Sequence, residues 1–271
     1  MMNRTIASIS TIVAAVSPTL VAFPSVAATL VNVEFVLSAD VSGSISSEEF
    51  DLQRQGYVNA FRDAELIDLI AGLDRGIAVT MQYWSSSAFS PLTWHHITDA
   101  ASANAFADAI AATERPGRGG TNIAAGLTSA TNLLLGNEFE GDRKVIDLSA
   151  DERNSCYRTC RVTMARDAAV AAGITINGLP ITRSSSSSLD DYFQAYVIGG
   201  EGAFTEVASE FGDFDRAVKA KLTREIPSNP RDSVSVPEPS STLGLLVFGC
   251  LGGRSFFKRK GNLNSQAKQR A

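Results

Sequence analysis

The segment VNVEFVLSADVSGSISSEEF, residues 31–50, decides the fold of this chain. Residues 31–37 form a mainly apolar run, as expected for a parallel strand that helices cover on both faces. After a short loop, Ser46 and Glu49 have the spacing of a capping box, in which each side chain satisfies a backbone amide at the start of a helix. The segment therefore predicts a strand, a tight loop and a helix in succession.

The same alternation continues along the chain. Further apolar runs predict strands at residues 77–84, 144–149 and 174–179, and helical periodicity predicts helices after Thr121 and around residues 101–112, 161–172 and 213–224. Strands that alternate with helices are typical of α/β proteins, so we expect a doubly wound, mainly parallel sheet flanked by helices, of the Rossmann-like type. Residues 29–226 have the length that one such domain can fill.

The composition excludes several classes of protein. The chain has 271 residues, of which 44% are hydrophobic and 20% charged, and this apolar content is too high for a disordered chain. Three cysteines are too few for a disulfide scaffold. The net charge of −5 and the lack of a basic domain argue against nucleic-acid binding. No mid-chain run of about 20 apolar residues occurs, which argues against a multi-pass membrane protein.

Both ends of the chain carry export features. Residues 1–28 are predicted to be a signal peptide, because Arg4 precedes an apolar stretch that ends in small residues. Residues 227–239 form a linker that ends in Pro-Glu-Pro, residues 240–260 join an apolar stretch to a basic cluster, and residues 261–271 form a polar tail. Without the two charged ends, residues 29–253 contain 17 basic and 29 acidic residues, a net charge of −12.

The C-terminal arrangement resembles the PEP-CTERM sorting signal of bacteria. The resemblance covers Val236 to Lys260 and includes the Pro-Glu-Pro triplet at residues 237–239. It implies that an exosortase processes the tail and releases the protein to the cell surface or the extracellular matrix. Contact with the membrane would then be transient and only through the C-terminal segment. A simple C-terminal membrane anchor is the alternative.

Oxygen-bearing side chains follow the first predicted strand. Asp40, Ser42 and Ser44 come from one tight loop, in which Gly43 permits the turn. Carboxylate and hydroxyl oxygens are the ligands that hard cations such as Mg²⁺ prefer. Thr121 precedes a predicted helix, and Asp151 follows the strand at residues 144–149. Because the carboxyl ends of parallel strands converge on one crevice, we expect these five residues to form a metal site.

This pattern resembles a von Willebrand factor type A (VWA) domain with its metal-ion-dependent adhesion site (MIDAS). That family has Asp-x-Ser-x-Ser, a distant Thr and a later Asp, which match Asp40, Ser42 and Ser44, then Thr121, then Asp151. The resemblance implies that Mg²⁺, or alternatively Mn²⁺ or Ca²⁺, is bound and that a partner's carboxylate completes its coordination. The family often has Gly after the last Asp, where this chain has Glu152. Asp147, inside the strand, is a poorer alternative to Asp151, and the serines and threonine alternatively serve only as caps.

The remaining reactive side chains have simpler interpretations. Cys156 and Cys160 could form a disulfide beside the metal loop in an exported protein, and Cys250 lies in the sorting tail. His95 and His96 are adjacent and would face opposite ways on a strand, which favours a surface or packing role.

These observations predict an exported, non-enzymatic module that uses a divalent cation to recognise an acidic group. The partner would be an acidic protein or an extracellular polysaccharide, and no nucleic acid. One alternative is a metal-dependent hydrolase that acts on phosphate or glycan at the same crevice, although the sequence offers no clear general base. The other is a structural matrix protein in which the metal only stabilises the fold.

Overall fold

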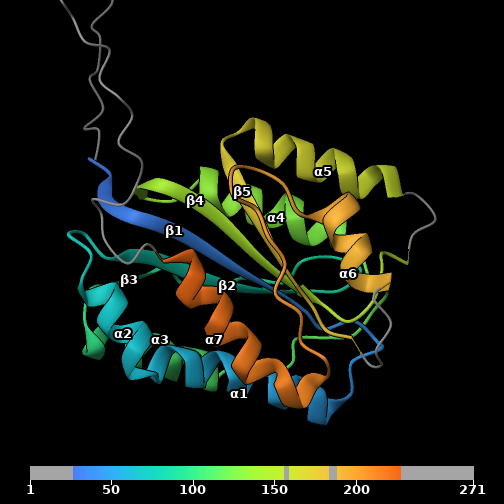
Figure 1. Ribbon diagram of the computed structural model, residues 1–271, viewed down its shortest axis with the longest axis horizontal. Coiled ribbons are helices and arrows are strands. Elements are labelled where there is room, and N and C mark those ends of the chain that lie inside the picture. Colours follow the sequence, from blue (N-terminus) through green and yellow to red (C-terminus); the bar gives the residue numbers. More distant parts are fainter. Residues whose placement is uncertain (1–26, 156–158, 183–187, 227–271) are drawn as a thin grey trace, which may run out of the picture. The chain divides into compact units, whose positions relative to one another are not determined.

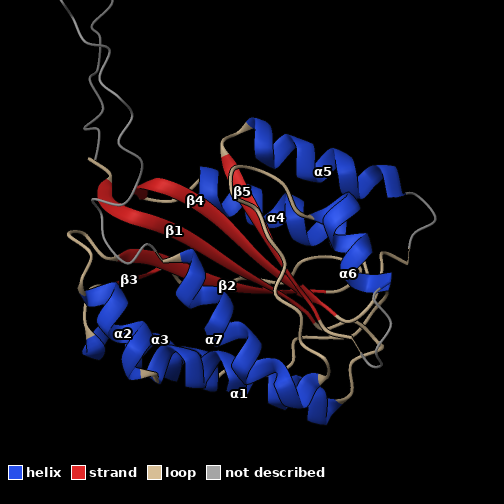
Figure 2. Cartoon of the chain, viewed as in Figure 1, coloured by secondary structure: helices blue, strands red, loops and turns tan. Residues whose placement is uncertain are grey.

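The computed structural model describes residues 27–155, 159–182 and 188–226, which form a five-stranded sheet with helices on both faces (Figures 1 and 2). The strands are β1 (Thr29–Asp40), β2 (Ile77–Trp84), β3 (His95–Ile97), β4 (Phe139–Ala150) and β5 (Ile174–Pro180). Their order in the sheet is β3-β2-β1-β4-β5, and all neighbours are parallel except the antiparallel edge pair of β2 and β3. The predicted mainly parallel α/β sheet is confirmed.

The register of the sheet brings the ends of the central strands together. Asp40, the last residue of β1, pairs with Trp84 at the end of β2. On the other side of β1, Ala39 pairs with Ser149, one residue before β4 ends. The loops that follow β1 and β4 therefore leave the sheet at the same edge, which is the arrangement that a site at the carboxyl ends requires.

Helices cover the two faces of the sheet (Figure 1). One face is covered by α1 (Ser47–Arg62), α2 (Ala64–Ala71), α3 (Ala100–Ala111) and α7 (Phe214–Glu225), and the other by α4 (Ile123–Leu135), α5 (Thr159–Ala171) and α6 (Ser188–Tyr192). A π-helical turn, Phe193–Val197, extends α6, and a 3₁₀ turn, Phe211–Asp213, precedes α7. The capping box predicted at the start of α1 is present, with Ser46 as the N-cap and Glu49 as its partner.

Each face of the sheet has its own hydrophobic core. In β1, Val33, Phe35 and Leu37 pack into the core beneath α1, α3 and α7, whereas Val36 packs into the core beneath α4 and α5. Successive residues of a strand point to opposite faces, so a strand buried on both sides is mainly apolar. This explains why the buried parts of the strands are mainly apolar rather than alternating, although they also hold buried polar side chains such as Glu34, Gln82 and Asn177.

The sequence analysis missed the shortest elements. Helix α2 is separated from α1 by Asp63 alone, whose side chain accepts hydrogen bonds from the amides of Glu65 and Leu66 and starts a new helix. Strand β3 has only three residues, too few for a period-two pattern. Helix α6 has only five residues and contains Asp190 and Asp191, which were expected to mark the start of a helix.

Several predictions concern residues outside the described part of the chain. These are nearly all of the signal peptide, the linker with the Pro-Glu-Pro motif, the sorting segment, the polar tail, and both Cys156 and Cys250. The disulfide between Cys156 and Cys160 therefore stays a prediction. None of the helices in the described ranges combines the length and apolar character needed to cross a membrane.

Candidate metal centre

The loop after β1 orders its polar groups around the Asp40 carboxylate. The backbone amide of Ser42 donates to Asp40 Oδ1 at 2.7 Å, which folds the chain back in a turn closed by the aspartate side chain. The turn brings the Ser42 and Ser44 hydroxyl oxygens within 3.0 Å of each other. Asp40 and Ser42 are fully buried, so the loop presents its oxygens inside the protein rather than to bulk water.

The loop after β4 meets this turn. Ser44 Oγ donates to Asp151 Oδ1 at 2.8 Å, although the two residues are 107 positions apart in the sequence. Asp151 directly follows Ala150, the last residue of β4, and its side chain is buried. Asp40, Ser42, Ser44 and Asp151 thus form one connected polar group at the carboxyl edge of the sheet.

Thr121 reaches the same edge from the loop before α4. It is 2% exposed and directly precedes Asn122, the N-cap of α4. Its Oγ1 lies 3.5 Å from Glu152 Oε2, and its carbonyl accepts hydrogen bonds from the backbone amide and the hydroxyl of Ser155. The loop that carries Asp151 therefore also holds Thr121, and all five predicted site residues lie in three loops that contact one another.

One atom of the cluster has no hydrogen-bond partner among the described residues and could contact a cation. Asp40 Oδ2 is buried and accepts no hydrogen bond from the described residues. The pKa of Asp40 is raised to about 7, mainly by burial and also by the negative charges of Asp151 and Glu152, while hydrogen bonds from Ser42 act in the opposite direction. A buried carboxylate without a partner is unfavourable, and a bound cation would supply the missing interaction.

The chemistry of the donors fits a hard cation. Carboxylates and hydroxyls offer oxygen alone, as Mg²⁺ and Ca²⁺ prefer. Within the described ranges, no three His, Cys, Asp or Glu side chains gather closely enough to hold a metal by themselves. The candidate site therefore depends on its serine and threonine hydroxyls, and a nitrogen- or sulfur-rich zinc site of the usual kind does not occur in this part of the chain.

Arg115 supports the loop of residues 41–46 between β1 and α1, called the metal loop below. The sequence analysis did not predict this role of Arg115. Its guanidinium donates to the carbonyls of Val41, Ser42 and Ile45 at 2.8, 2.7 and 2.8 Å. Arg118 adds a contact of 3.1 Å to the Ile45 carbonyl. The only signal in the sequence was the position of two arginines among glycines just before Thr121, which does not indicate what they bind.

The segment that carries these arginines also touches the loop through its backbone. The Gly43 amide donates to the Gly119 carbonyl at 2.7 Å, and a Cβ at position 43 would lie 3.3 Å from that oxygen. Burial and the neighbouring Arg118 lower the pKa of the Arg115 guanidinium, whereas Asp40 and Asp151 act to raise it. The site thus combines buried acids with two arginines that bind the backbone carbonyls of the loop after β1.

The alternative candidates lie elsewhere. Asp147 is buried inside β4, where its Oδ2 is 2.8 Å from Lys221 Nζ, so it faces a helix rather than the strand-end loops. His95 and His96 pair with Val79 and Ala78 near the start of β2, at the opposite end of the sheet from Asp40. The ring centroids of His95 and Phe106 are 5.0 Å apart, and those of His96 and Phe139 are 6.0 Å apart. These contacts agree with the predicted surface or packing role.

Comparisons with known proteins place the chain in a family. The family model described as "Protein of unknown function (DUF1194)" matches residues 30–230. The chain belongs to the DUF1194 family. No curated protein matches the sequence of this DUF1194 protein.

Solved structures share the fold of the DUF1194 chain. The pilus adhesin SpaC of Lactobacillus rhamnosus GG has a TM-score of 0.54 at 15% identity, with 72% of this chain and 30% of that chain covered. The PilB minor pilin of Streptococcus sanguinis also has a TM-score of 0.54, at 14% identity, with 72% of this chain and 62% of that chain covered. Proximal thread matrix protein 1 of the mussel byssus was solved with a zinc-occupied MIDAS motif. It has a TM-score of 0.50 at 16% identity, with 72% of this chain and 46% of that chain covered.

These similarities confirm the predicted VWA-type α/β fold of the DUF1194 chain. The chain spans less than two thirds of the length of each of the three proteins.

Proposed function

We propose that this protein is a binding module that recognises an acidic group through a divalent cation. The observation that carries the proposal is that the three loops bearing Asp40, Ser42, Ser44, Thr121 and Asp151 contact one another at one edge of the sheet. In this cluster, the buried Asp40 Oδ2 has no hydrogen-bond partner among the described residues. The shared fold with a pilus adhesin and a matrix protein supports a role in adhesion.

The five residues would have two different roles in binding the cation. The hydroxyls of Ser42, Ser44 and Thr121 would contact it, while Asp40 and Asp151 would balance its charge, directly or through water. A Mg²⁺ ion keeps several of its waters, so a partial protein shell leaves positions at which a carboxylate can bind. We propose Mg²⁺ as the cation, with Mn²⁺ or Ca²⁺ as alternatives.

The protein would act outside the cell. The predicted signal peptide and the PEP-CTERM-like tail support export and processing by an exosortase, and two of the structural neighbours are a pilus adhesin and a byssus matrix protein. An acidic protein or an acidic extracellular polysaccharide would then be the partner at the cell surface or in the matrix.

Isothermal titration calorimetry of the full chain with Mg²⁺ and Mn²⁺ tests the metal site. We expect saturable binding that Asp40→Ala abolishes, because this change removes the central carboxylate of the loop. Asp51→Ala is the matched control, since Asp51 is an exposed acid on α1 that pairs with Arg54. Equal cation affinity in wild type and Asp40→Ala would contradict the site, provided that circular dichroism shows both to be folded.

We infer a binding role rather than catalysis. Asp151 accepts a hydrogen bond from Ser44, and Asp40 is buried at the base of the loop, so neither is placed as a general base facing a substrate. Assays with phosphoester and glycan substrates check this inference. Turnover that requires metal and disappears in Asp40→Ala would establish the hydrolase alternative. A metal that raises the melting temperature without any partner being bound would favour the structural alternative.

A further inference from the structure

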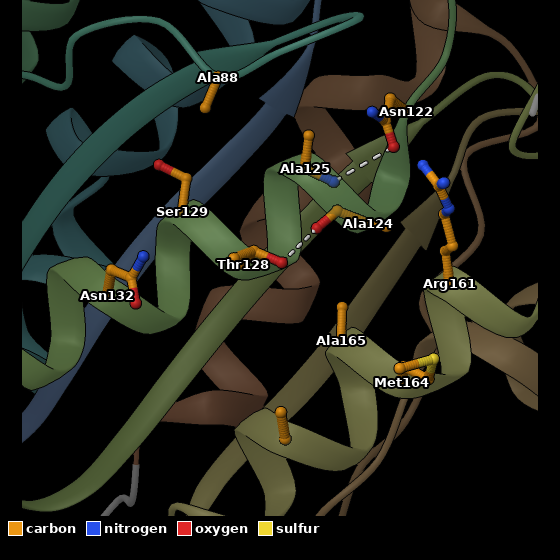
Figure 3. A pocket seen from close by; sticks show the side chains of 11 residues that line it. Ala88, Asn122, Ala124, Ala125, Thr128, Ser129, Asn132, Arg161, Met164 and Ala165 are labelled. Atoms are coloured by element: carbon orange, nitrogen blue, oxygen red, sulfur yellow. Dashed lines mark hydrogen bonds between the residues drawn. The ribbon is translucent and has the colours of Figure 1, made fainter.

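A groove of about 650 Å³ runs between α4 and α5 (Figure 3). One wall consists of a face of α4, on which Ala125, Ser129 and Asn132 follow at intervals of four and three residues. The other wall consists of a face of α5, on which Arg161, Ala165 and Ala168 follow at the same intervals. Residues at this spacing share one side of a helix, so each helix presents a continuous strip to the groove. The volume lies within the range of ligand-binding pockets.

The groove is lined by small apolar side chains and by polar ones. Alanine methyl groups line both helices, while Asn122, Thr128, Ser129 and Asn132 contribute hydroxyl and amide groups. None of the lining residues is acidic, in a chain whose residues 29–253 carry a net charge of −12. The charge of the groove therefore differs from that of the rest of the body, and it favours an anionic ligand.

Arg161 supplies this charge. Its side chain is exposed, and within the described ranges it makes neither a hydrogen bond nor an ion pair. Figure 3 shows that it extends from α5 toward Asn122, at the start of α4. An exposed guanidinium without a protein partner can bind a carboxylate with two parallel hydrogen bonds.

The groove adjoins the candidate metal centre. Asn122 lines the groove and directly follows Thr121, one of the five site residues. The Asn122 side chain is held in place, because its Nδ2 donates to the Ser86 carbonyl at 3.0 Å and its Oδ1 accepts from the Ala125 amide at 3.3 Å. A ligand that reaches the cation from this side would therefore pass Asn122 and approach Arg161.

The lining favours a peptide as the ligand. Arg and Met are enriched in protein–protein interfaces, and Met164 is 69% exposed beside Arg161. A flexible thioether adapts to side chains of different shape. The groove also has no aromatic side chain among its lining residues, so it offers no flat ring on which a sugar could stack.

We propose that the groove between α4 and α5 is a second binding site, which receives an acidic peptide segment of the partner and holds one of its carboxylates on Arg161. The proposal rests on the proposed function, because it extends the metal-bound ligand from the cation into the groove. The hydroxyl and amide groups of α4 would then bind the peptide backbone. A ligand that spans both sites gains affinity from the short distance between them without either contact being strong.

The test uses fluorescence anisotropy of the full chain in Mg²⁺ with two labelled probes, a ten-residue oligo-aspartate and polygalacturonate. We expect oligo-aspartate to bind and Arg161→Glu to weaken this binding at least tenfold. Ala168→Trp, which fills the groove at an exposed position, should weaken it to a similar degree. Arg62→Glu makes the same change of charge on α1, on the other face of the sheet, and should leave binding unchanged.

Calorimetry of the same variants with Mg²⁺ separates the two proposals. Wild-type cation affinity in Arg161→Glu, together with weakened oligo-aspartate binding, would support the groove. Unchanged oligo-aspartate binding in both groove variants would overturn it and leave the metal site intact, whereas loss of cation binding in wild type would overturn the proposed function itself. Binding of neither probe, or dependence of polygalacturonate alone on Arg161, would also overturn the peptide site.

Discussion

At the scale of single residues, Arg115 determines the shape of the metal loop as much as the candidate ligands do. Its single guanidinium donates hydrogen bonds to the carbonyls of Val41, Ser42 and Ile45. Residues that orient metal ligands without touching the metal typically change affinity by 10- to 100-fold when they are replaced. Arg115 would be such a residue at the proposed metal site, where it acts through the three carbonyls that accept its hydrogen bonds.

Arg115→Gln should therefore weaken Mg²⁺ binding by about tenfold and lower the free energy of unfolding by about 2 kcal/mol, because three carbonyls lose a charged donor. Arg115→Lys should behave similarly, since an ammonium group cannot span three acceptors with the geometry of a guanidinium. Calorimetry and urea denaturation measure the two effects.

Arg118→Gln is the control for this prediction. Arg118 donates to the same loop from an exposed position at 3.1 and 3.4 Å, so its replacement should have a much smaller effect on both quantities. Equal effects of the two substitutions would show that Arg115 acts through its charge and not as a clamp on the loop.

At the scale of elements, the packing of α1 on α7 depends on a buried glycine. A Cβ on Gly56 would lie 2.6 Å from Phe214 Cδ1 and 3.3 Å from the backbone of Asp215. The next residue, Tyr57, packs against the Phe214 ring with the centroids 5.2 Å apart. The two helices approach each other at Gly56 because it has no side chain, although glycine is a poor helix former.

Gly56→Ala consequently has two opposite effects on the free energy of unfolding. Helix propensity would stabilise the variant by up to about 1 kcal/mol, whereas overpacking costs about 1–3 kcal/mol. Two of the three nearest atoms belong to backbone, which cannot easily move, so we expect overpacking to be the larger effect. The free energy of unfolding, measured by urea denaturation, should fall by about 1–2 kcal/mol.

Gly72→Ala provides the comparison. Gly72 ends α2 with helical backbone angles, and its Cβ would meet no atom closer than 3.4 Å, so this variant should be at least as stable as wild type. A stabilised Gly56→Ala variant would mean that α1 and α7 can separate slightly without loss.

At the scale of the whole molecule, buried polar groups connect the sheet to its last helix. Lys221 of α7 is fully buried, with its Nζ 2.8 Å from Asp147 of β4 and 2.6 Å from Glu225 of the same helix. Asn177 of β5 donates to Glu225 at 2.7 Å. Polar groups in such a core specify one position of the helix, because any shift leaves a buried charge without its partner.

This network should make stability depend on pH. The pKa of Glu225 is raised from its ordinary value of 4.5 to about 7, mainly by burial and also by the nearby Asp147, although Lys221 acts in the opposite direction. The folded protein thus binds a proton more tightly than the unfolded chain. The corresponding stability is present below about pH 4.5 and is lost as the pH rises through about 7, with an upper limit of about 3 kcal/mol.

Glu225→Gln should reduce this dependence, because the amide does not ionise, while the contribution of Asp40, whose pKa is also raised to about 7, remains. Urea denaturation at pH 5 and pH 8 should show that wild type loses about 2–3 kcal/mol more than the variant over this interval. Glu201→Gln changes an exposed glutamate and should follow the wild-type profile. Parallel profiles of wild type and Glu225→Gln would show that another group dominates the pH response in this range.

The sequence by itself determined the elements whose signals are local. Apolar runs identified the four parallel strands, and the capping box identified the start of α1, because burial on two faces and the satisfaction of helix-end amides are properties of short segments. The order of strands and loops also predicted which oxygen-bearing side chains meet, since parallel strands end at one edge of the sheet.

Only the tertiary structure decided what depends on contacts between distant segments. The binding of Arg115 to the metal loop, the burial of Lys221 between two acids and the groove between α4 and α5 each join residues from different elements. The sequence does not distinguish an arginine or lysine that is exposed to water from one that donates hydrogen bonds to a loop. Its role is fixed by the acceptors that the fold places within reach, and no local periodicity records them.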